Sequence, residues 1–188
     1  MNPVTKAVST ARILEPVEMK FPNIPVLLAS IAVTSGCVTS HPQSAAEFRT
    51  AVPGAFMATV EKYEVQQPFH KVAERFQKMA PRCLDVSVKT VSQSTTSYQV
   101  IVTDYKPTVI VQQDRAELHV QQHFAQGVMT VTEEPPGGYY LMVFDAIKMD
   151  ANRTRIEYYG PSAGQDAMIK AIKGWASGSN VGCPDLTA

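Results

Sequence analysis

The chain has little cysteine, little tryptophan and no excess of charge of either sign, and these shortages exclude several classes of protein. Of its 188 residues, three are cysteine and one is tryptophan, while 17 basic residues balance 17 acidic ones. Without net charge there is no strong single-sign field, so we expect no nucleic-acid partner. The length and the 45% hydrophobic content fit one globular domain.

Catalytic and cofactor motifs are also missing. Serine, histidine and aspartate are present, but no Gly-x-Ser-x-Gly motif accompanies them. Gly137 and Gly138 follow two prolines in a loop, and Gly174 and Gly178 follow a helical pattern, so no glycine-rich turn opens a helix to hold phosphate. We therefore expect neither an enzyme nor a bound cofactor.

The nearest approach to a metal site is the pair His119 and His123. In a strand these residues lie four apart on one face, with Gln121 between them, which is too far for easy shared ligation. Glu117 is the only carboxylate in phase with them. We predict no metal site and interpret the pair as part of a polar, exposed sheet face, although a helical conformation would bring the two rings together.

A signal-like segment, MKFPNIPVLLASIAVTSGC, occupies residues 19–37, well inside the chain. A lysine precedes an apolar run over residues 24–33, and small residues follow, which is the order of a secretory signal. The run is about half of the roughly 20 residues that a membrane-spanning helix needs. Residues 1–18 have no such run, so we predict that translation starts at Met19 and that residues 1–18 are a start-site artefact or an extension.

The end of this segment, Thr34-Ser35-Gly36-Cys37, resembles the cleavage box of bacterial lipoprotein signals. The resemblance implies that residues 19–36 are removed and that Cys37 is acylated, palmitate included, with enough chains for stable anchoring. The resemblance also implies that Val38, next to Cys37, is no inner-membrane retention signal, so the expected location is the outer membrane, facing the periplasm. The alternative is that residues 24–33 form a buried strand and that Cys37 is an ordinary thiol.

The other two cysteines, Cys83 and Cys183, would then lie in an oxidising compartment, and we predict a disulfide between them. The loop closed is about 100 residues long, for which chain entropy gives about 4 to 5 kcal/mol of stability. Two separate buried thiols are the alternative. A catalytic dithiol is disfavoured because neither cysteine lies in a Cys-x-x-Cys motif.

The mature chain divides into a tether, residues 37–55, and a domain, residues 56–188. The tether contains Ser, Thr, Pro and Gly with little periodicity, and we expect it to be flexible. A strand is predicted from Phe56 to Val65, and a helix from Pro68 that should end just before Pro81. The apolar face of this helix is predicted to consist of Val72, Phe76, Met79 and Cys83.

Strand-like runs fill the middle of the domain, and a helix follows them. The runs are residues 86–91, 98–103, 108–112, 117–124, 127–133, 139–149 and 153–159. The last run should place Thr154, Ile156 and Tyr158 on a covered face, and Arg153, Arg155, Glu157 and Tyr159 on the other. Ser162 and Gln165 have capping-box spacing for a final helix that ends at Gly174 and Gly178. Its apolar positions are Met168, Ala171, Ile172 and Trp175.

This order of strand, helix, strands and helix predicts an α+β fold in which two helices pack on one face of an antiparallel sheet. The order resembles the helix-grip arrangement, in particular the repeated domains of BamC-type envelope lipoproteins. The resemblance rests on element order and on the lipidation signal, so it transfers no functional residues.

A binding surface is predicted on the outward side of the last strands. Tyr140 and Tyr159 are its aromatic candidates, because aromatic rings are enriched at interfaces. Arg153 and Arg155 could meet an acidic partner. The alternatives are cross-strand packing for the tyrosines and a solvated edge for the arginines.

Two functional classes follow from these expectations. One is a non-enzymatic binding or assembly module that contacts an envelope protein or a cell-wall component. The other is a carrier of a small lipid-like ligand held between the sheet and the C-terminal helix. An apolar cavity under Trp175 would favour the carrier and a solid core the binding module, while an enzyme would need a cleft with converging polar side chains. The sequence indicates no oligomeric state.

Overall fold

Six antiparallel strands form one open sheet in a computed structural model that describes residues 41–93, 98–124 and 134–187. The strands are β1 (Ala58–Val65), β2 (Val86–Gln93), β3 (Tyr98–Val111), β4 (Arg115–Phe124), β5 (Tyr139–Lys148) and β6 (Thr154–Pro161). Their spatial order is β1-β6-β5-β4-β3-β2. The first two strands of the chain therefore lie at opposite edges of the sheet.

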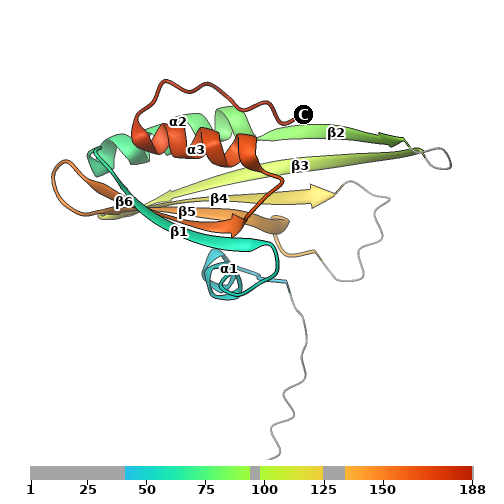
Figure 1. Ribbon diagram of the computed structural model, residues 1–188, viewed down its shortest axis with the longest axis horizontal. Coiled ribbons are helices and arrows are strands. Elements are labelled where there is room, and N and C mark those ends of the chain that lie inside the picture. Colours follow the sequence, from blue (N-terminus) through green and yellow to red (C-terminus); the bar gives the residue numbers. More distant parts are fainter. Residues whose placement is uncertain (1–40, 94–97, 125–133, 188) are drawn as a thin grey trace, which may run out of the picture. The chain divides into compact units, whose positions relative to one another are not determined.

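Helices cover both faces of this sheet (Figure 1). The helices α2 (Phe69–Leu84) and α3 (Asp166–Ser177) lie together on one face, and the short α1 (Ala45–Ala51) lies on the other. The predicted fold class is thus confirmed: an α+β fold with an antiparallel sheet and two helices on one face. None of the described helices combines the length and the apolar character needed to cross a membrane.

The prediction of a flexible tether over residues 37–55 is wrong for α1. The side chain of Ser44 caps the helix by accepting a hydrogen bond from the amide of Glu47 at 3.2 Å. Ala45 and Val52 are buried, and Arg49 forms ion pairs with the sheet. These contacts join segments far apart in the chain, and local composition does not reveal them.

Pro81 does not end α2, contrary to the prediction, because the helix continues to Leu84. A proline inside a helix costs about 3 kcal/mol. Beyond it, however, Leu84 is fully buried and Cys83 is 4% exposed, and burying one leucine side chain alone contributes roughly 1.5 to 3 kcal/mol. Of the predicted apolar face, Val72, Phe76 and Cys83 are buried and Met79 is partly buried.

The two predicted strands over residues 98–103 and 108–112 are one continuous strand, β3, which includes Pro107. Proline is tolerated there because β2 pairs with β3 only up to Tyr105, so Pro107 has a neighbour, Val120, on one side only. The predicted strand over residues 127–133 lies outside the described residues.

The last strand agrees with its predicted pattern, whereas the capping box does not form. Thr154, Ile156 and Tyr158 are all fully buried. The amide of Ser162 donates to the carbonyl of Met57 at 2.9 Å, and α3 begins only at Asp166. The helix ends at Gly178 in the left-handed conformation, with φ 83°, and Gly174 lies inside it.

One apolar core fills the space between the sheet and its two longer helices. Met168, Ile172 and Trp175 of α3 are at most 1% exposed and share this core with α2 and the central strands. The predicted bond between Cys83 and Cys183 is present, with 4.9 Å between the Cα atoms. It fastens the C-terminal tail over the helices (Figure 1).

Candidate functional site

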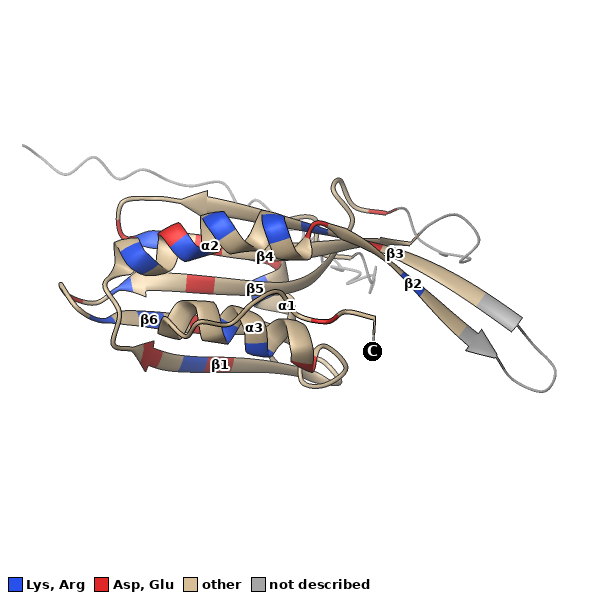
Figure 2. Cartoon of the chain, turned by 90° about the horizontal axis from the view of Figure 1, so that it is seen from above, with Lys and Arg blue, Asp and Glu red and all other residues tan. Residues whose placement is uncertain are grey.

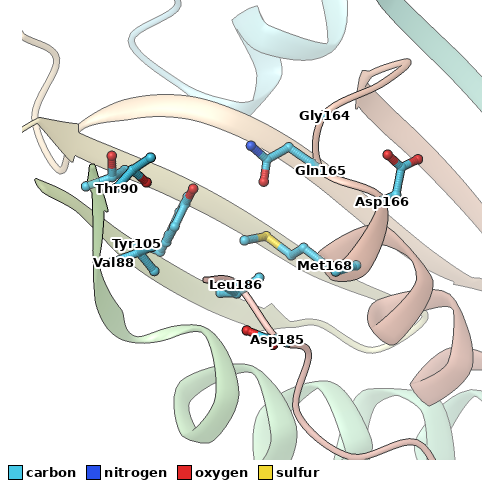
Figure 3. Close-up of a pocket in the computed structure, with 11 residues that line it drawn as sticks. Val88, Thr90, Tyr105, Gly164, Gln165, Asp166, Met168, Asp185 and Leu186 are labelled. Atoms are coloured by element: carbon cyan, nitrogen blue, oxygen red, sulfur yellow. The ribbon is translucent and has the colours of Figure 1, made fainter. Parts of the chain in front are cut away.

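A pocket of about 460 Å³ opens on the helix-covered face (Figure 3). It lies between the paired strands β2 and β3, the start of α3 and the C-terminal tail. Residues 164–168 form one wall and the tail forms another. The strands contribute Val88, Thr90, Thr103 and Tyr105, and the tail contributes Asp185 and Leu186.

Strand alternation explains why these side chains meet. Val88 and Thr90 are two residues apart in β2, as are Thr103 and Tyr105 in β3, so each pair points to one face of the sheet. Val88 lies directly opposite Thr103 in the register. All four therefore belong to the face that α2 and α3 cover, close to the edge of the sheet.

Tyr105 contributes a hydroxyl group to the lining of the pocket. Its side chain is 9% exposed and belongs to the apolar core. Within the described part of the chain its hydroxyl has no hydrogen-bond partner, and Figure 3 shows it directed into the pocket, toward the space between Thr90 and Gln165. A tyrosine hydroxyl can both donate and accept a hydrogen bond, so this group can bind a donor or acceptor of a ligand.

The start of α3 supplies further hydrogen-bond donors. Gln165 is the N-cap residue but makes no side-chain cap hydrogen bond, and the first intrahelical bond runs from Ile169 to the Gln165 carbonyl at 3.0 Å. The first-turn amides therefore have no partner within the helix. In Figure 3 the Gln165 side chain extends toward Tyr105.

The charge of the lining is negative. Among the described residues, Asp166 and Asp185 are the charged members of the lining, and none of its members is a lysine, arginine or histidine. Figure 2 shows acidic residues at the start of α3 and on the C-terminal tail, whereas the charged residues of α2 are mostly basic. A hydrogen bond from the Thr187 hydroxyl to Asp185, at 2.6 Å, lowers the pKa of Asp185. An anionic ligand is disfavoured here.

The four predicted surface residues lie elsewhere, and the structure does not bring them into one open surface. Tyr140, Tyr159 and Arg155 lie on the face that α1 covers. The Tyr140 ring packs near Phe48 of α1, with 6.0 Å between ring centroids. Arg153 follows the turn between β5 and β6, where it pairs with Asp150 at 2.7 Å.

Two of these predicted residues surround a buried carboxylate, Glu157. The Tyr159 hydroxyl donates to Glu157 at 2.8 Å, and Arg155 lies 3.2 Å from its other oxygen. Glu157 itself is 8% exposed. Both side chains are thus engaged with a neighbour two residues away on the same strand.

The histidine pair does not converge on one point. Nδ1 of His119 lies 2.8 Å from Glu117, and Nδ1 of His123 lies 2.9 Å from Glu134. No group of three or more potential metal ligands occurs among the described residues. The face is polar, as predicted, but His119 is only 6% exposed, so the prediction of an exposed face is wrong at this position. The ring lies beside Tyr140, which in turn lies beside Phe48 of α1.

An arginine and carboxylate cluster holds α1 against the sheet, and sequence inspection did not detect it. Arg49 donates to both oxygens of Asp145 at 2.7 Å and also bonds Glu117. Arg115 donates to Asp145 at 2.8 Å. These residues are up to 96 positions apart in the sequence. Hydrophobic periodicity carries no signal for such a cluster.

This cluster makes stability depend on acid pH. Hydrogen bonding by His119, together with Arg49, lowers the pKa of Glu117 to about 2. A carboxylate whose pKa is lowered in the folded state contributes stability that is present above its unfolded pKa, near 4.5, and is lost as pH falls toward 2. We expect Glu117→Gln to flatten this part of the pH profile in urea denaturation between pH 6 and pH 2. The exposed control Glu74→Gln should leave the profile unchanged, and an unaltered profile in Glu117→Gln would contradict the assignment.

Comparisons with known proteins assign no function to this site. No protein-family model and no curated protein matches the chain. Among solved structures, the chain is similar to the crystal structure of a hypothetical protein from Helicobacter pylori. The two share 12% identity with a TM-score of 0.35, over 69% of this chain and 90% of that one. A likeness this weak carries no argument about fold or function.

Proposed function

We propose that this chain is an envelope lipoprotein, anchored through Cys37, whose α+β domain is a non-enzymatic binding module with its ligand site in the pocket beside Tyr105. The signal-like segment that ends at Cys37 supports the anchor. The observation that carries the binding site is the Tyr105 hydroxyl, which belongs to a buried side chain, has no partner among the described residues and is aimed into the pocket.

The lining selects for a small polar ligand that is uncharged or positively charged. Tyr105, Thr90 and Thr103 offer hydroxyl groups, and the start of α3 offers amides. Val88 and Leu186 add apolar surface against which a ring or a short side chain can pack. The two carboxylates favour an amine and repel phosphate. A sugar or a short peptide of the cell wall has this chemistry, and the pocket volume is within the range for small-molecule sites.

The packing under α3 favours a binding module over a carrier of a lipid-like molecule. A carrier needs an apolar cavity between the Trp175 helix and the sheet. Trp175, Ile172 and Met168 instead pack into the common core with at most 1% of their surface exposed. The pocket lies at the start of α3, and its hydroxyl groups and carboxylates do not suit an acyl chain.

The lining also favours binding over catalysis. In the described part of the chain, no histidine, lysine or cysteine lines the pocket to activate the threonine or tyrosine hydroxyls as nucleophiles. Asp185, a carboxylate at the rim, is hydrogen-bonded to Thr187. The converging groups can therefore orient a ligand, and the described lining shows no nucleophile paired with a base of the kind that acyl transfer requires.

Three sugars of one ring type test the site, because they differ in charge. We expect glucosamine and N-acetylglucosamine to shift NMR signals of residues around Tyr105, and glucose 6-phosphate to leave them unchanged. Tyr105→Phe removes one hydrogen bond, which is worth about 0.5 to 1.5 kcal/mol, and should weaken binding roughly 2- to 10-fold.

Tyr63→Phe is the matched control for this experiment. The Tyr63 hydroxyl is also buried without a partner among the described residues, but Tyr63 does not line the pocket. The Tyr63→Phe variant should bind glucosamine and N-acetylglucosamine with the affinity of the unaltered protein. Equal affinities in the Tyr105→Phe and Tyr63→Phe variants, or saturable binding of the phosphate sugar alone, would overturn the assignment of the pocket.

A further inference from the structure

The loop between α1 and β1 exposes two large apolar side chains. Residues 52–57, VPGAFM, carry no charge. Phe56 is 93% exposed and Met57 is 57% exposed, which are the two highest values among the exposed large hydrophobic residues of the described chain. The neighbouring outer side of α1 is formed by Ala46, Glu47, Thr50 and Ala51, with a single charge among them.

The backbone holds this loop in place. The amide of Ala55 donates to Val52 at 3.1 Å, and the carbonyl of Met57 accepts from the amide of Ser162 at 2.9 Å. Met57 adopts a φ of 55°, and it is the only residue other than glycine with a positive φ in the described chain. This conformation is unfavourable for a bulky side chain. The apolar side chains are therefore presented in a fixed, outward geometry at some conformational cost.

The short length of chain between the proposed anchor and the loop limits how far the loop can lie from the membrane. Cys37 is seven residues before the cap residue Ser44, so even a fully extended connection is no longer than about 25 Å. The helix α1 adds about 10 Å before the loop begins. An acyl chain on Cys37 thus keeps the loop within reach of the membrane surface.

We infer that Phe56 and Met57 insert into the interfacial region of the lipid bilayer to which Cys37 is attached. The inference rests on the proposed anchor. An uncharged apolar loop suits the boundary between headgroups and acyl chains, where amphipathic segments bury their apolar side by about 5 to 10 Å. Because α1 and the two longer helices lie on opposite faces of the sheet (Figure 1), contact through the α1 side leaves the helix-covered face free for a ligand.

Tryptophan fluorescence of the complete lipidated chain tests this contact. Phe56→Trp places a reporter in the loop, and Met149→Trp, at a residue 41% exposed just after β5, is the matched control. The native Trp175 is 1% exposed and gives a constant background. The proteins are reconstituted into phosphatidylethanolamine and phosphatidylglycerol vesicles, with and without lipids brominated on the acyl chains, and their intact masses are recorded.

We expect the Phe56→Trp reporter to shift its emission to shorter wavelength and to lose most of its intensity with brominated lipid, while Met149→Trp keeps its emission. Equal responses of the two reporters, in protein whose mass shows acyl chains on Cys37, would overturn the loop contact and leave the anchor standing. A mass without acyl chains would remove the anchor, and the loop contact with it.

Discussion

Replacing both Cys83 and Cys183 by alanine is expected to lower the free energy of unfolding by about 4 to 5 kcal/mol. The bond joins residues 100 positions apart, and closing a loop of this length restricts the unfolded chain by roughly that amount. For a single domain whose total stability is about 5 to 15 kcal/mol, the loss is large. Urea denaturation of the oxidised protein and of the double variant measures it.

The same substitution should also weaken ligand binding, because the disulfide positions the tail that lines the pocket. Cys183 is two residues before Asp185 and three before Leu186. The indole of Trp175 donates to the Val181 carbonyl at 3.2 Å and holds only the part of the tail before the disulfide. Reductant added to the unaltered protein should reproduce the loss of stability. If neither the substitution nor the reductant changed the stability, that result would contradict the assignment of the bond.

Asp145→Asn is expected to destabilise the fold by about 3 kcal/mol. The carboxylate is 1% exposed and lies between Arg49 and Arg115. Removing one partner of a buried ion pair leaves the other charge uncompensated and costs about 3 to 5 kcal/mol. We expect the lower end of that range because the Arg115 side chain is 42% exposed and Arg49 keeps its bond to Glu117.

Asp114→Asn is the matched control, since it makes the same change at an exposed ion pair. Asp114 is 60% exposed and lies 3.2 Å from Lys148, and such surface pairs contribute about 0 to 1 kcal/mol. Urea denaturation compares the two variants. The account of α1 would be wrong if both variants lost the same small amount of stability, because Asp145 would then hold nothing in place.

The fold class could be predicted from the sequence because its signals are local and periodic. The alternation of Thr154, Ile156 and Tyr158 identified the covered face of the sheet, and the spacing of Ile172 and Trp175 identified the buried face of α3. The disulfide followed from cysteine count and expected compartment. Pro81 was misleading because the burial that follows it in α2 outweighs its local effect.

The residues of the candidate site could not be predicted from such local signals. Its residues come from β2, β3, α3 and the tail, and only the register between Val88 and Thr103 brings the strand residues together. Tyr105 had no distinguishing neighbour in sequence. The tyrosines singled out instead, Tyr140 and Tyr159, lie on the face that α1 covers, and α1 itself was missed because its stability depends on distant ion pairs.

The central proposal is that Cys37 anchors the chain to a membrane of the cell envelope. Both the proposed orientation of the domain and the proposed class of ligand depend on it. Intact mass spectrometry of the protein purified from membranes of its native host tests it directly, without and then with reductant and alkylation. The account predicts residues 37–188 plus acyl chains, with two thiols that appear only after reduction. A full-length mass with three free thiols would contradict the anchor, the disulfide and the compartment together.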